Sequence, residues 1–186
     1  DNRTIAYTSE REGHPNIYVA KINRKDDANF PNATLIDETP LVKANDGVER
    51  TYPKYSPDGK EIAFIQDRRK LMVMNLDTKK VRQITDGSTY PERNGGFDYK
   101  WSPDGKWFVI ELTGNGHEPY SDIAIVNATG TPKVTNITRS SYFDMEPQWV
   151  MDGNAIAFVS DRYGLRSHAS WGSQNDIMLA FLNQDA

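Results

Sequence analysis

A tight turn followed by a short apolar run occurs three times along the chain, and this repeat constrains the fold more than any other feature. Asp is followed by Gly at Asp58, Asp104 and Asp152, so successive copies are 46 and 48 residues apart. The first two turns read Ser-Pro-Asp-Gly, in which Pro fixes the backbone of the second position and Gly accepts the left-handed conformation. The third turn, Val150–Gly153, keeps only the Asp-Gly pair, so we expect a weaker hairpin there. The apolar runs after the turns are Ile62–Phe64, Phe108–Ile110 and Ile156–Phe158.

Two further motifs recur after each of these runs, so a complete unit contains four short strands. The third strand of the units is expected at Asn16–Val19, Lys70–Val73, Asp122–Ile125 and Asp176–Leu179. The fourth strand begins at Val81 and at Val134, with a looser copy over Leu41–Gly47, and the insertion Asn23–Pro40 is expected to be a solvated loop. The chain opens on the second strand of a unit, at Ile5–Tyr7, and stops before the fourth strand of the last one. The count is 14 strands in four units.

Short strands repeated at a fixed period predict an all-β fold, specifically a β-propeller with four-stranded blades. No stretch shows a sustained 3.6-residue apolar period, so we expect little helix. A single blade cannot bury both of its faces, and stacking on neighbouring blades buries them. A β-sandwich also contains many short strands, but the fixed period and the recurring turn disfavour it. We therefore predict a partial propeller over residues 1–186, with approximate units 1–50, 51–96, 97–144 and 145–186.

The incomplete first and last units allow two arrangements. The missing edges could complete each other and close a small four-bladed ring, or the chain could be an arc of a larger ring. We favour the arc, because the end units look like interior units and have no capping features. An open arc exposes apolar faces and strand edges, so self-association through the open blade edges is expected.

Composition excludes several classes of function. The 186 residues include no cysteine, which rules out disulfides, thiolate zinc sites and a cysteine nucleophile. With 22 basic and 26 acidic side chains the net charge is −4, which argues against a nucleic-acid partner. The longest apolar run, Ile177–Leu182, is far shorter than the roughly 20 residues of a membrane-spanning helix. Because the chain begins at Asp1 rather than Met, we expect a mature form or an excised piece of a longer protein.

The repeat also carries a family resemblance. The pattern Ser-Pro-Asp-Gly-Lys, found at 56–60 and 102–106, with strands such as Ile-Ala-Phe and Ile-Tyr-Val, resembles the propeller repeats of TolB and of tricorn proteases. It also resembles the N-terminal propellers of the prolyl-oligopeptidase and dipeptidyl-peptidase families. The segment Ser160–Asp176 is more specific, since it resembles the last propeller blade of bacterial tricorn-like serine peptidases.

The tricorn resemblance implies a non-catalytic propeller that gates or binds peptide or protein substrates. The catalytic residues would then lie in a downstream region of the same chain, with a PDZ domain and protease domains, so none is assigned here. A periplasmic or secreted bacterial location is implied, although a cytoplasmic one also fits. The alternatives are a TolB-like protein-binding scaffold without a peptidase, and a prolyl-oligopeptidase-type propeller followed by an α/β-hydrolase domain.

No catalytic, metal or cofactor site is expected from the motifs. The Gly-x-Ser-x-Gly nucleophile elbow does not occur, and Ser167–Ser170 brings Ser and His together only in sequence. His117 and Glu118 begin like a zinc-protease motif, but the second His is missing and Pro119 would interrupt the helix that the motif needs.

The connection Asp161–Asn175 in the fourth unit is the best candidate for binding, because function in repeat folds usually sits on loops. Arg, Trp and Tyr are frequent in interface hot spots and suit peptide carboxylates and aromatic side chains. A structural role, in which Trp171 packs the loop down, is equally compatible. The candidate residues for contact with a substrate or another domain are Arg162, Tyr163, Arg166, His168 and Trp171.

Aromatic residues occupy one repeated position just before the turn. They are Tyr55, Trp101 and Trp149 in successive units. Equivalent aromatics in every repeat are expected to belong to the core between blades.

Overall fold

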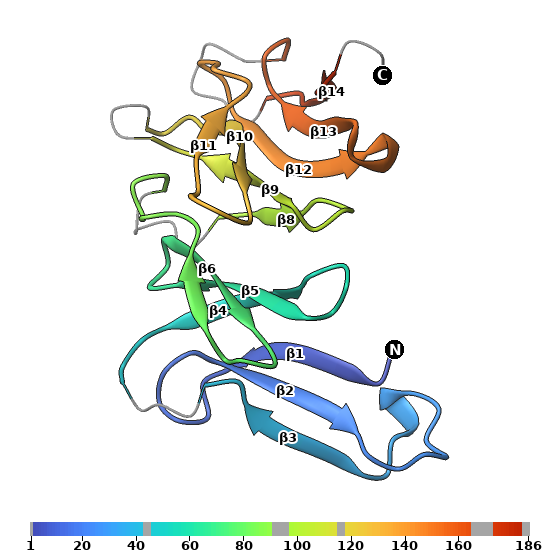
Figure 1. Cartoon of the computed structure of the whole chain (residues 1–186). Helices are drawn as coiled ribbons and strands as arrows, with labels where there is room; N and C mark the ends of the chain where they lie inside the picture. Colours follow the sequence, from blue (N-terminus) through green and yellow to red (C-terminus); the bar gives the residue numbers. More distant parts are fainter. Residues whose placement is uncertain (1, 43–45, 91–96, 115–117, 165–172, 184–186) are drawn as a thin grey trace.

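A computed structural model of the chain describes residues 2–42, 46–90, 97–114, 118–164 and 173–183. Its strands form four antiparallel sheets, stacked in sequence order from one end of the molecule to the other (Figure 1). Helix within these ranges is limited to the 3-10 turns η1 (Phe30–Asn32) and η3 (Met151–Gly153). The predicted all-β propeller architecture is confirmed.

Each sheet is built from consecutive strands that pair with their neighbours in sequence. Sheet 1 contains β1 (Thr4–Ser9), β2 (Asn16–Ile22) and β3 (Ile36–Pro40). Sheet 2 contains β4 (Arg50–Tyr55), β5 (Glu61–Gln66), β6 (Lys70–Asn75) and β7 (Val81–Gln83). Sheet 3 contains β8 (Tyr99–Trp101), β9 (Trp107–Leu112), β10 (Asp122–Asn127) and β11 (Val134–Asn136). Sheet 4 contains β12 (Asp144–Val150), β13 (Ala155–Ser160) and β14 (Asp176–Phe181).

Side chains alternate across each strand, so every sheet has a preceding face, toward the sheet before it, and a following face, toward the sheet after it. In β5, Ile62 and Phe64 share a buried cluster with Ile17 of sheet 1. Ile65 of the same strand points the other way and shares a cluster with Phe108 of sheet 3. The near-continuous apolar runs of the sequence are therefore strands that are covered on both faces.

The junction of sheets 3 and 4 repeats this arrangement. Val109 and Ile123 on the following face of sheet 3 share a cluster with Ile156 and Phe158 on the preceding face of sheet 4. Burial of one such side chain contributes roughly 1.5–3 kcal/mol. Stacking of sheets is thus the main source of stability in this fold.

In the part of the chain that the structure describes, the stack is open at both ends. Among the described residues, no strand of sheet 4 pairs with a strand of sheet 1. The two sheets lie at opposite ends of the molecule in Figure 1. The described sheets therefore do not close into a four-bladed ring, and their stack has the shape of an arc.

The last strand of sheet 1 lies before its predicted position. The sequence pattern indicated a strand within Leu41–Gly47 and a loop over the whole of Asn23–Pro40, and the structure corrects both, because β3 spans Ile36–Pro40. Pairing of Ile36 with Ile22 of β2 sets this register. The side chains of β3 are mostly exposed, so no hydrophobic pattern marks the strand in the sequence.

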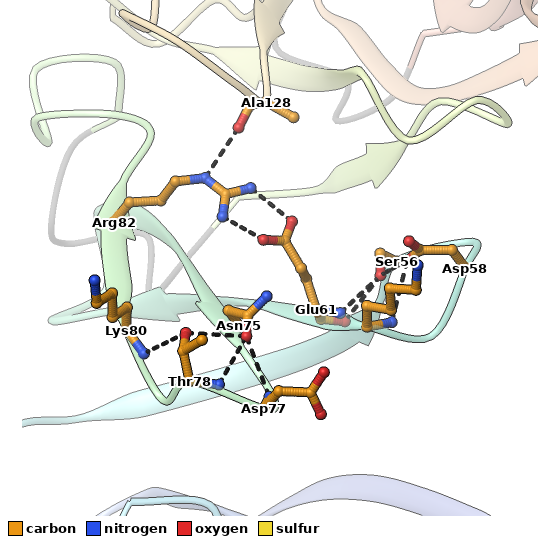
Figure 2. Close-up of polar contacts among 10 residues, drawn as sticks. Ser56, Asp58, Glu61, Asn75, Asp77, Thr78, Lys80, Arg82 and Ala128 are labelled. Atoms are coloured by element: carbon orange, nitrogen blue, oxygen red, sulfur yellow. Dashed lines mark hydrogen bonds and ion pairs between the residues drawn. The ribbon is translucent and has the colours of Figure 1, made fainter.

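The two Ser-Pro-Asp-Gly turns have the same hydrogen bonds. In the first turn, the Ser56 hydroxyl donates to Asp58 at 2.7 Å and accepts from the Glu61 N–H at 2.9 Å (Figure 2). In the second turn, the Ser102 hydroxyl donates to Asp104 at 2.6 Å. In both turns, the hydrogen bond from the serine hydroxyl has the largest effect on the aspartate, and the backbone N–H of the lysine two residues after the aspartate adds to it. Together they hold the pKa of Asp58 and of Asp104 below the usual range.

The third turn is built differently. Met151, Asp152 and Gly153 have φ values of 53°, 54° and 92° in succession. Only Gly adopts this region without steric cost, and for other residues the cost is roughly 1–2 kcal/mol. This third turn, whose sequence has no Ser-Pro pair, is therefore held in a strained conformation.

The repeated aromatic position ties neighbouring sheets together. Nε1 of Trp101 donates to the carbonyl of Lys54 in the sheet before it at 3.1 Å. Nε1 of Trp149 donates to the carbonyl of Lys100 at 3.2 Å in the same way. These rings and that of Tyr55 are half-buried and pack against the clusters between sheets.

A second tie joins sheets 2 and 3 near the turns. The guanidinium of Arg82 pairs with both carboxylate oxygens of Glu61, and its Nε donates to the carbonyl of Ala128 at 3.1 Å (Figure 2). Bidentate pairing fixes the orientation of an arginine. Arg82 thereby connects the last strand of sheet 2 to the end of β10 in sheet 3.

Replacing Trp101 should separate its hydrogen bond from its packing. We expect Trp101→Phe to lower the free energy of unfolding by about 1 kcal/mol, because one inter-sheet hydrogen bond is lost, and Trp101→Ala to lower it by about 3–5 kcal/mol. Urea denaturation measures both values. Tyr55→Phe is the control and should change stability by less than about 0.5 kcal/mol. Equal losses in Trp101→Phe and Tyr55→Phe would show that the indole hydrogen bond contributes nothing.

The strained turn offers a stabilising substitution. Met151→Gly should raise the free energy of unfolding by about 1 kcal/mol, because Gly adopts the positive φ without a Cβ clash. The same logic predicts that Gly59→Ala, at φ 71°, lowers stability by a similar amount. Thermal melts should shift by about 2–4 °C in opposite directions. A lower melting temperature for Met151→Gly would contradict the strain argument.

Candidate functional site

Two of the five residues predicted to contact a ligand or another domain are described in the structure. Arg162 follows β13 and is half-buried, whereas the neighbouring Tyr163 is exposed. Outside the described residues lie Arg166, His168 and Trp171, together with His117 and the segment Ser167–Ser170. The role of the loop in binding stays a prediction.

Arg162 is held at the base of this loop by a buried carboxylate. Its Nη2 lies 3.4 Å from Oδ2 of Asp144, whose side chain is fully buried. The Ser140 hydroxyl donates to the same oxygen at 2.7 Å, and the guanidinium lies 5.8 Å from the ring centroid of Tyr142. A buried carboxylate is costly without a paired cation. Arg162 therefore stabilises the connection between sheets 3 and 4.

The first strands of sheets 2, 3 and 4 follow one another along one side of the stack, which we call the inner side. Two of these strands contain a bulge, at Tyr52 in β4 and at Glu146 in β12, and both residues have φ near 54°. A bulge leaves its N–H outside the strand ladder. The Tyr52 N–H donates to Oγ1 of Thr8 at 3.2 Å, and the Glu146 N–H donates to Oε1 of Glu111 at 2.9 Å. In both cases, a side chain of the preceding sheet accepts the hydrogen bond of the bulged N–H, and the two accepting residues occupy equivalent positions in their strands.

Glu111 is the more constrained of the two acceptors. Its second oxygen accepts the N–H of Asp98 at 3.4 Å, so one carboxylate bridges the inner strands of sheets 3 and 4. Burial raises the pKa of Glu111, and the hydrogen bonds from the two backbone N–H groups only partly oppose this rise. Glu111 is a structural clamp whose charged form is destabilised by its surroundings.

A cluster of charges joins the inner strands of sheets 2 and 3. Nζ of Lys54 lies 2.9 Å from one oxygen of Asp98, and Nζ of Lys100 lies 2.6 Å from the other. Lys54 also donates to the carbonyl of Tyr99 and lies 4.5 Å from its ring centroid. Burial raises the pKa of Asp98, but hydrogen bonds from the two lysines outweigh it and bring the value below the usual range. Two ammonium groups share the one carboxylate of Asp98, so one positive charge is left over, and the contacts tie the inner strands of sheets 2 and 3 together as part of the scaffold.

A cleft of about 1430 Å³ opens between sheets 1 and 2. Pockets for small ligands usually occupy about 300–1000 Å³, so this cleft has room for a longer occupant. Its walls are mainly apolar and include Val19, Leu41, Phe64, Met74 and Leu76.

The two ends of the cleft differ in charge. Lys21 and Lys79 line the end near the turns of sheet 2. Arg50 and Gln66 line the other end, where Arg50 is already paired with Asp46 at 2.7 Å. The hydrogen bond from Arg50, with a smaller contribution from the backbone N–H of Val48, lowers the pKa of Asp46 to about 2. The cleft thus combines an apolar middle with basic side chains at one end.

Beside the cleft runs an unpaired strand edge. In the described part of the chain, β1 pairs only with β2. The alternation of an antiparallel ladder, together with the bond from the Ile22 N–H to the Arg3 carbonyl, places the backbone groups of Thr4, Ala6 and Thr8 on the open edge. Such an edge can pair with an extended segment.

Sequence reasoning did not identify the bulges or the cleft. A signal for the bulges was present, because Pro53 and Pro147 follow the bulged residues at the same repeat position. Proline has no N–H to donate and so marks an edge or a bulge. The cleft has no sequence signal, since it depends on how two sheets lie against each other.

Comparison with known families gives one extended match. The family model described as the TolB beta propeller domain matches residues 52–167, which is more than half of the chain.

Individual relatives include one protein named after the tricorn-like proteases and several TolB proteins. A protein of Sulfurisphaera tokodaii, named as a Tricorn-like protease C-terminal subunit, is 34% identical over 110 residues, covering 59% of this chain and 12% of the relative. The Tol-Pal system protein TolB of Francisella tularensis is 35% identical over 89 residues, covering 45% and 18%. TolB of Bordetella pertussis is 30% identical over 160 residues, covering 86% and 32%. The chain spans less than a third of the length of these relatives.

Among solved structures, an oligogalacturonate lyase from Vibrio parahaemolyticus superimposes with a TM-score of 0.46 at 13% identity, covering 85% of this chain and 55% of the lyase. Within the described ranges, no helix is long and apolar enough to cross a membrane. The same residues contain no group of three or more acidic or histidine side chains suited to a metal ion.

Glu111→Gln should change how stability depends on pH. Because the folded-state pKa of Glu111 is raised, its contribution is fully present below the unfolded value of about 4.3 and is lost as pH rises through the folded value. Gln does not titrate, so the variant should gain stability relative to the native chain between about pH 4 and pH 7. Urea denaturation at pH 4 and at pH 7 measures the difference in the free energy of unfolding between the variant and the native chain. An equal difference in the free energy of unfolding between Glu111→Gln and the native chain at the two pH values would contradict the burial argument.

Proposed function

The chain belongs to the TolB-type β-propeller family, and on this premise we propose that it is the non-catalytic, peptide-holding propeller of a multidomain serine peptidase of the tricorn kind. The tricorn-like relative supports the peptidase parent. The observation that carries peptide binding is the apolar cleft beside the open edge of β1.

An extended peptide fits this place as a fourth strand of sheet 1. Its backbone would pair with the N–H and C=O groups of Thr4, Ala6 and Thr8, and alternate side chains would enter the cleft. Main-chain hydrogen bonds provide affinity for many sequences, whereas the apolar walls and Lys21 and Lys79 select among them. A peptide with alternating apolar residues and an acidic end therefore matches the cleft best.

Cleavage would take place elsewhere in the whole protein. We propose that a PDZ domain and protease domains belong to the same polypeptide and that the propeller delivers peptides to them. A periplasmic or secreted location is part of this proposal. The isolated chain should cleave no peptide, and stoichiometric peptidase activity of the purified chain would overturn the assignment.

A TolB-like protein-binding scaffold is the second candidate. The Bordetella pertussis relative, a Tol-Pal system protein, covers 86% of this chain and favours it. The coding sequence beyond residue 186 separates the two: PDZ and protease regions support the first candidate, and a stop codon soon after supports the second.

Peptide binding can be tested by filling the cleft. Fluorescence anisotropy should detect binding of a fluorescein-labelled peptide with alternating Leu and Thr residues and a terminal pair of Glu. Val19→Trp should weaken binding by about tenfold, because the indole occupies the space of the peptide side chains. N-methylation of alternate peptide residues should also abolish binding, since it removes the strand hydrogen bonds.

The matched control is Val159→Trp, also a half-buried valine on a following face but remote from the cleft. It should bind the peptide as the native chain does. Equal affinity of native chain, Val19→Trp and Val159→Trp would place the peptide outside the cleft. No binding by the native chain would reject the peptide-holding role.

A further inference from the structure

A small polar pocket lies at the end of sheet 3 where β9 ends, β10 begins and β11 ends. Its volume is about 340 Å³. Sites for small molecules usually occupy roughly 300–1000 Å³, so this pocket suits a ligand of few atoms. We call it the sheet 3 pocket, and the described residues that line it include Leu112, Asp122, Asn136, Arg139, Ser140 and Ser141.

The repeat allows the sheet 3 pocket to be compared with the same place in sheet 2. The hydroxyl of Thr85 accepts the N–H of Leu71 at 2.9 Å in sheet 2. The hydroxyl of Thr138 accepts the N–H of Ile123 at 3.0 Å in sheet 3. These matching hydrogen bonds fix which residues of the two sheets are equivalent.

The residues next to these bonds have opposite charges in the two sheets. Asp122 stands in sheet 3 where sheet 2 has Lys70, and Arg139 stands where sheet 2 has Asp86. A methyl carbon placed on Gly87 would lie 3.5 Å from Cγ of Lys70, so the lysine stem fills this place in sheet 2. Asp122 is shorter and buried, so the corresponding space in sheet 3 stays open. A repeat can fold without these exchanged charges, and they therefore point to a role particular to sheet 3.

Hydrogen bonds hold the backbone of the sheet 3 pocket in place. Asp122 accepts the side-chain amide of Asn136 at 2.7 Å and the N–H of Ser140 at 2.7 Å. The Ser140 hydroxyl donates to the buried Asp144 at 2.7 Å. The N–H of Arg139 donates to Oδ1 of Asn136 at 3.0 Å. The segment that contains Arg139 is thus fixed in advance, which lowers the entropic cost of binding a ligand.

Two residues of this segment have donor groups to spare. Within the described part of the chain, the guanidinium of Arg139 makes no ion pair or hydrogen bond, and the hydroxyl and N–H of Ser141 make no hydrogen bond. A guanidinium offers parallel N–H groups that match the two oxygens of a carboxylate. Leu112 adds an apolar surface on which a short alkyl chain can lie.

We infer that the sheet 3 pocket binds a small monocarboxylate, with the carboxylate on Arg139 and Ser141 and the alkyl chain beside Leu112. A single negative charge is favoured because Asp122 places another negative charge in the wall. A doubly charged phosphate would be repelled more strongly by Asp122 and would find only the one cation. The sheet 3 pocket is separate from the cleft between sheets 1 and 2, so the inference does not depend on peptide binding there.

Nuclear magnetic resonance of the ¹⁵N-labelled chain tests the ligand class. Titration with sodium butyrate at constant ionic strength should shift the Arg139 Nε–H and Ser141 N–H signals until they saturate. Butyramide, which has the same shape without the charge, and inorganic phosphate should each bind at least about tenfold more weakly. Shifts that do not saturate with butyrate, or butyramide or phosphate binding as tightly as butyrate, would overturn the inference.

Substitutions locate the binding site. Arg139→Gln should weaken butyrate binding by about tenfold or more, since it removes the charge-assisted hydrogen bonds. Arg68→Gln is the matched control, because Arg68 is also an exposed arginine at positive φ but does not line the sheet 3 pocket. Arg68→Gln and the cleft variant Val19→Trp should bind butyrate as the native chain does. Native affinity in Arg139→Gln, or a tenfold loss in either control, would contradict the assignment.

Discussion

Each sheet of this protein has two apolar faces, and only another sheet can cover them. Strand residues point alternately to the sheet before and the sheet after, so no single unit can bury its own core. The clusters around Phe64, Phe108 and Phe158 are each shared between two consecutive sheets. Stability, shape and the properties of the two ends all follow from this dependence of each sheet on its neighbours.

Polar groups on the inner side fix how the stacked sheets are aligned. Apolar packing is nonspecific in direction, whereas a hydrogen bond is satisfied only in a narrow range of geometry. Trp101 and Trp149 donate to carbonyls of the preceding sheet, and Thr8 and Glu111 accept the N–H groups of bulges in the following sheet. The bulge contact joins sheets 1 and 2, the tryptophan contact joins sheets 2 and 3, and both join sheets 3 and 4, so each junction is aligned by at least one of these ties.

The candidate peptide site originates in the way sheet 1 lies beside sheet 2. Sheet 1 has no strand on the open side of β1 within the described residues, and this leaves both a strand edge and the cleft next to sheet 2. No sheet follows sheet 4 among the described residues, and Ile177 and Leu179 are exposed. In each case the chemistry is that of an interior position.

The sequence by itself determined the repeat, the number and order of the strands and the two Ser-Pro-Asp-Gly turns, because these depend on local chemistry such as Ser56 bonding to Asp58. It misplaced β3, whose exposed side chains leave no pattern and whose register comes from pairing with β2. It identified Arg162 without its partner Asp144, which lies 18 residues away along the chain. The cleft and the bulge clamps were decided only by the tertiary structure, since each is formed by side chains of different sheets that come together through stacking.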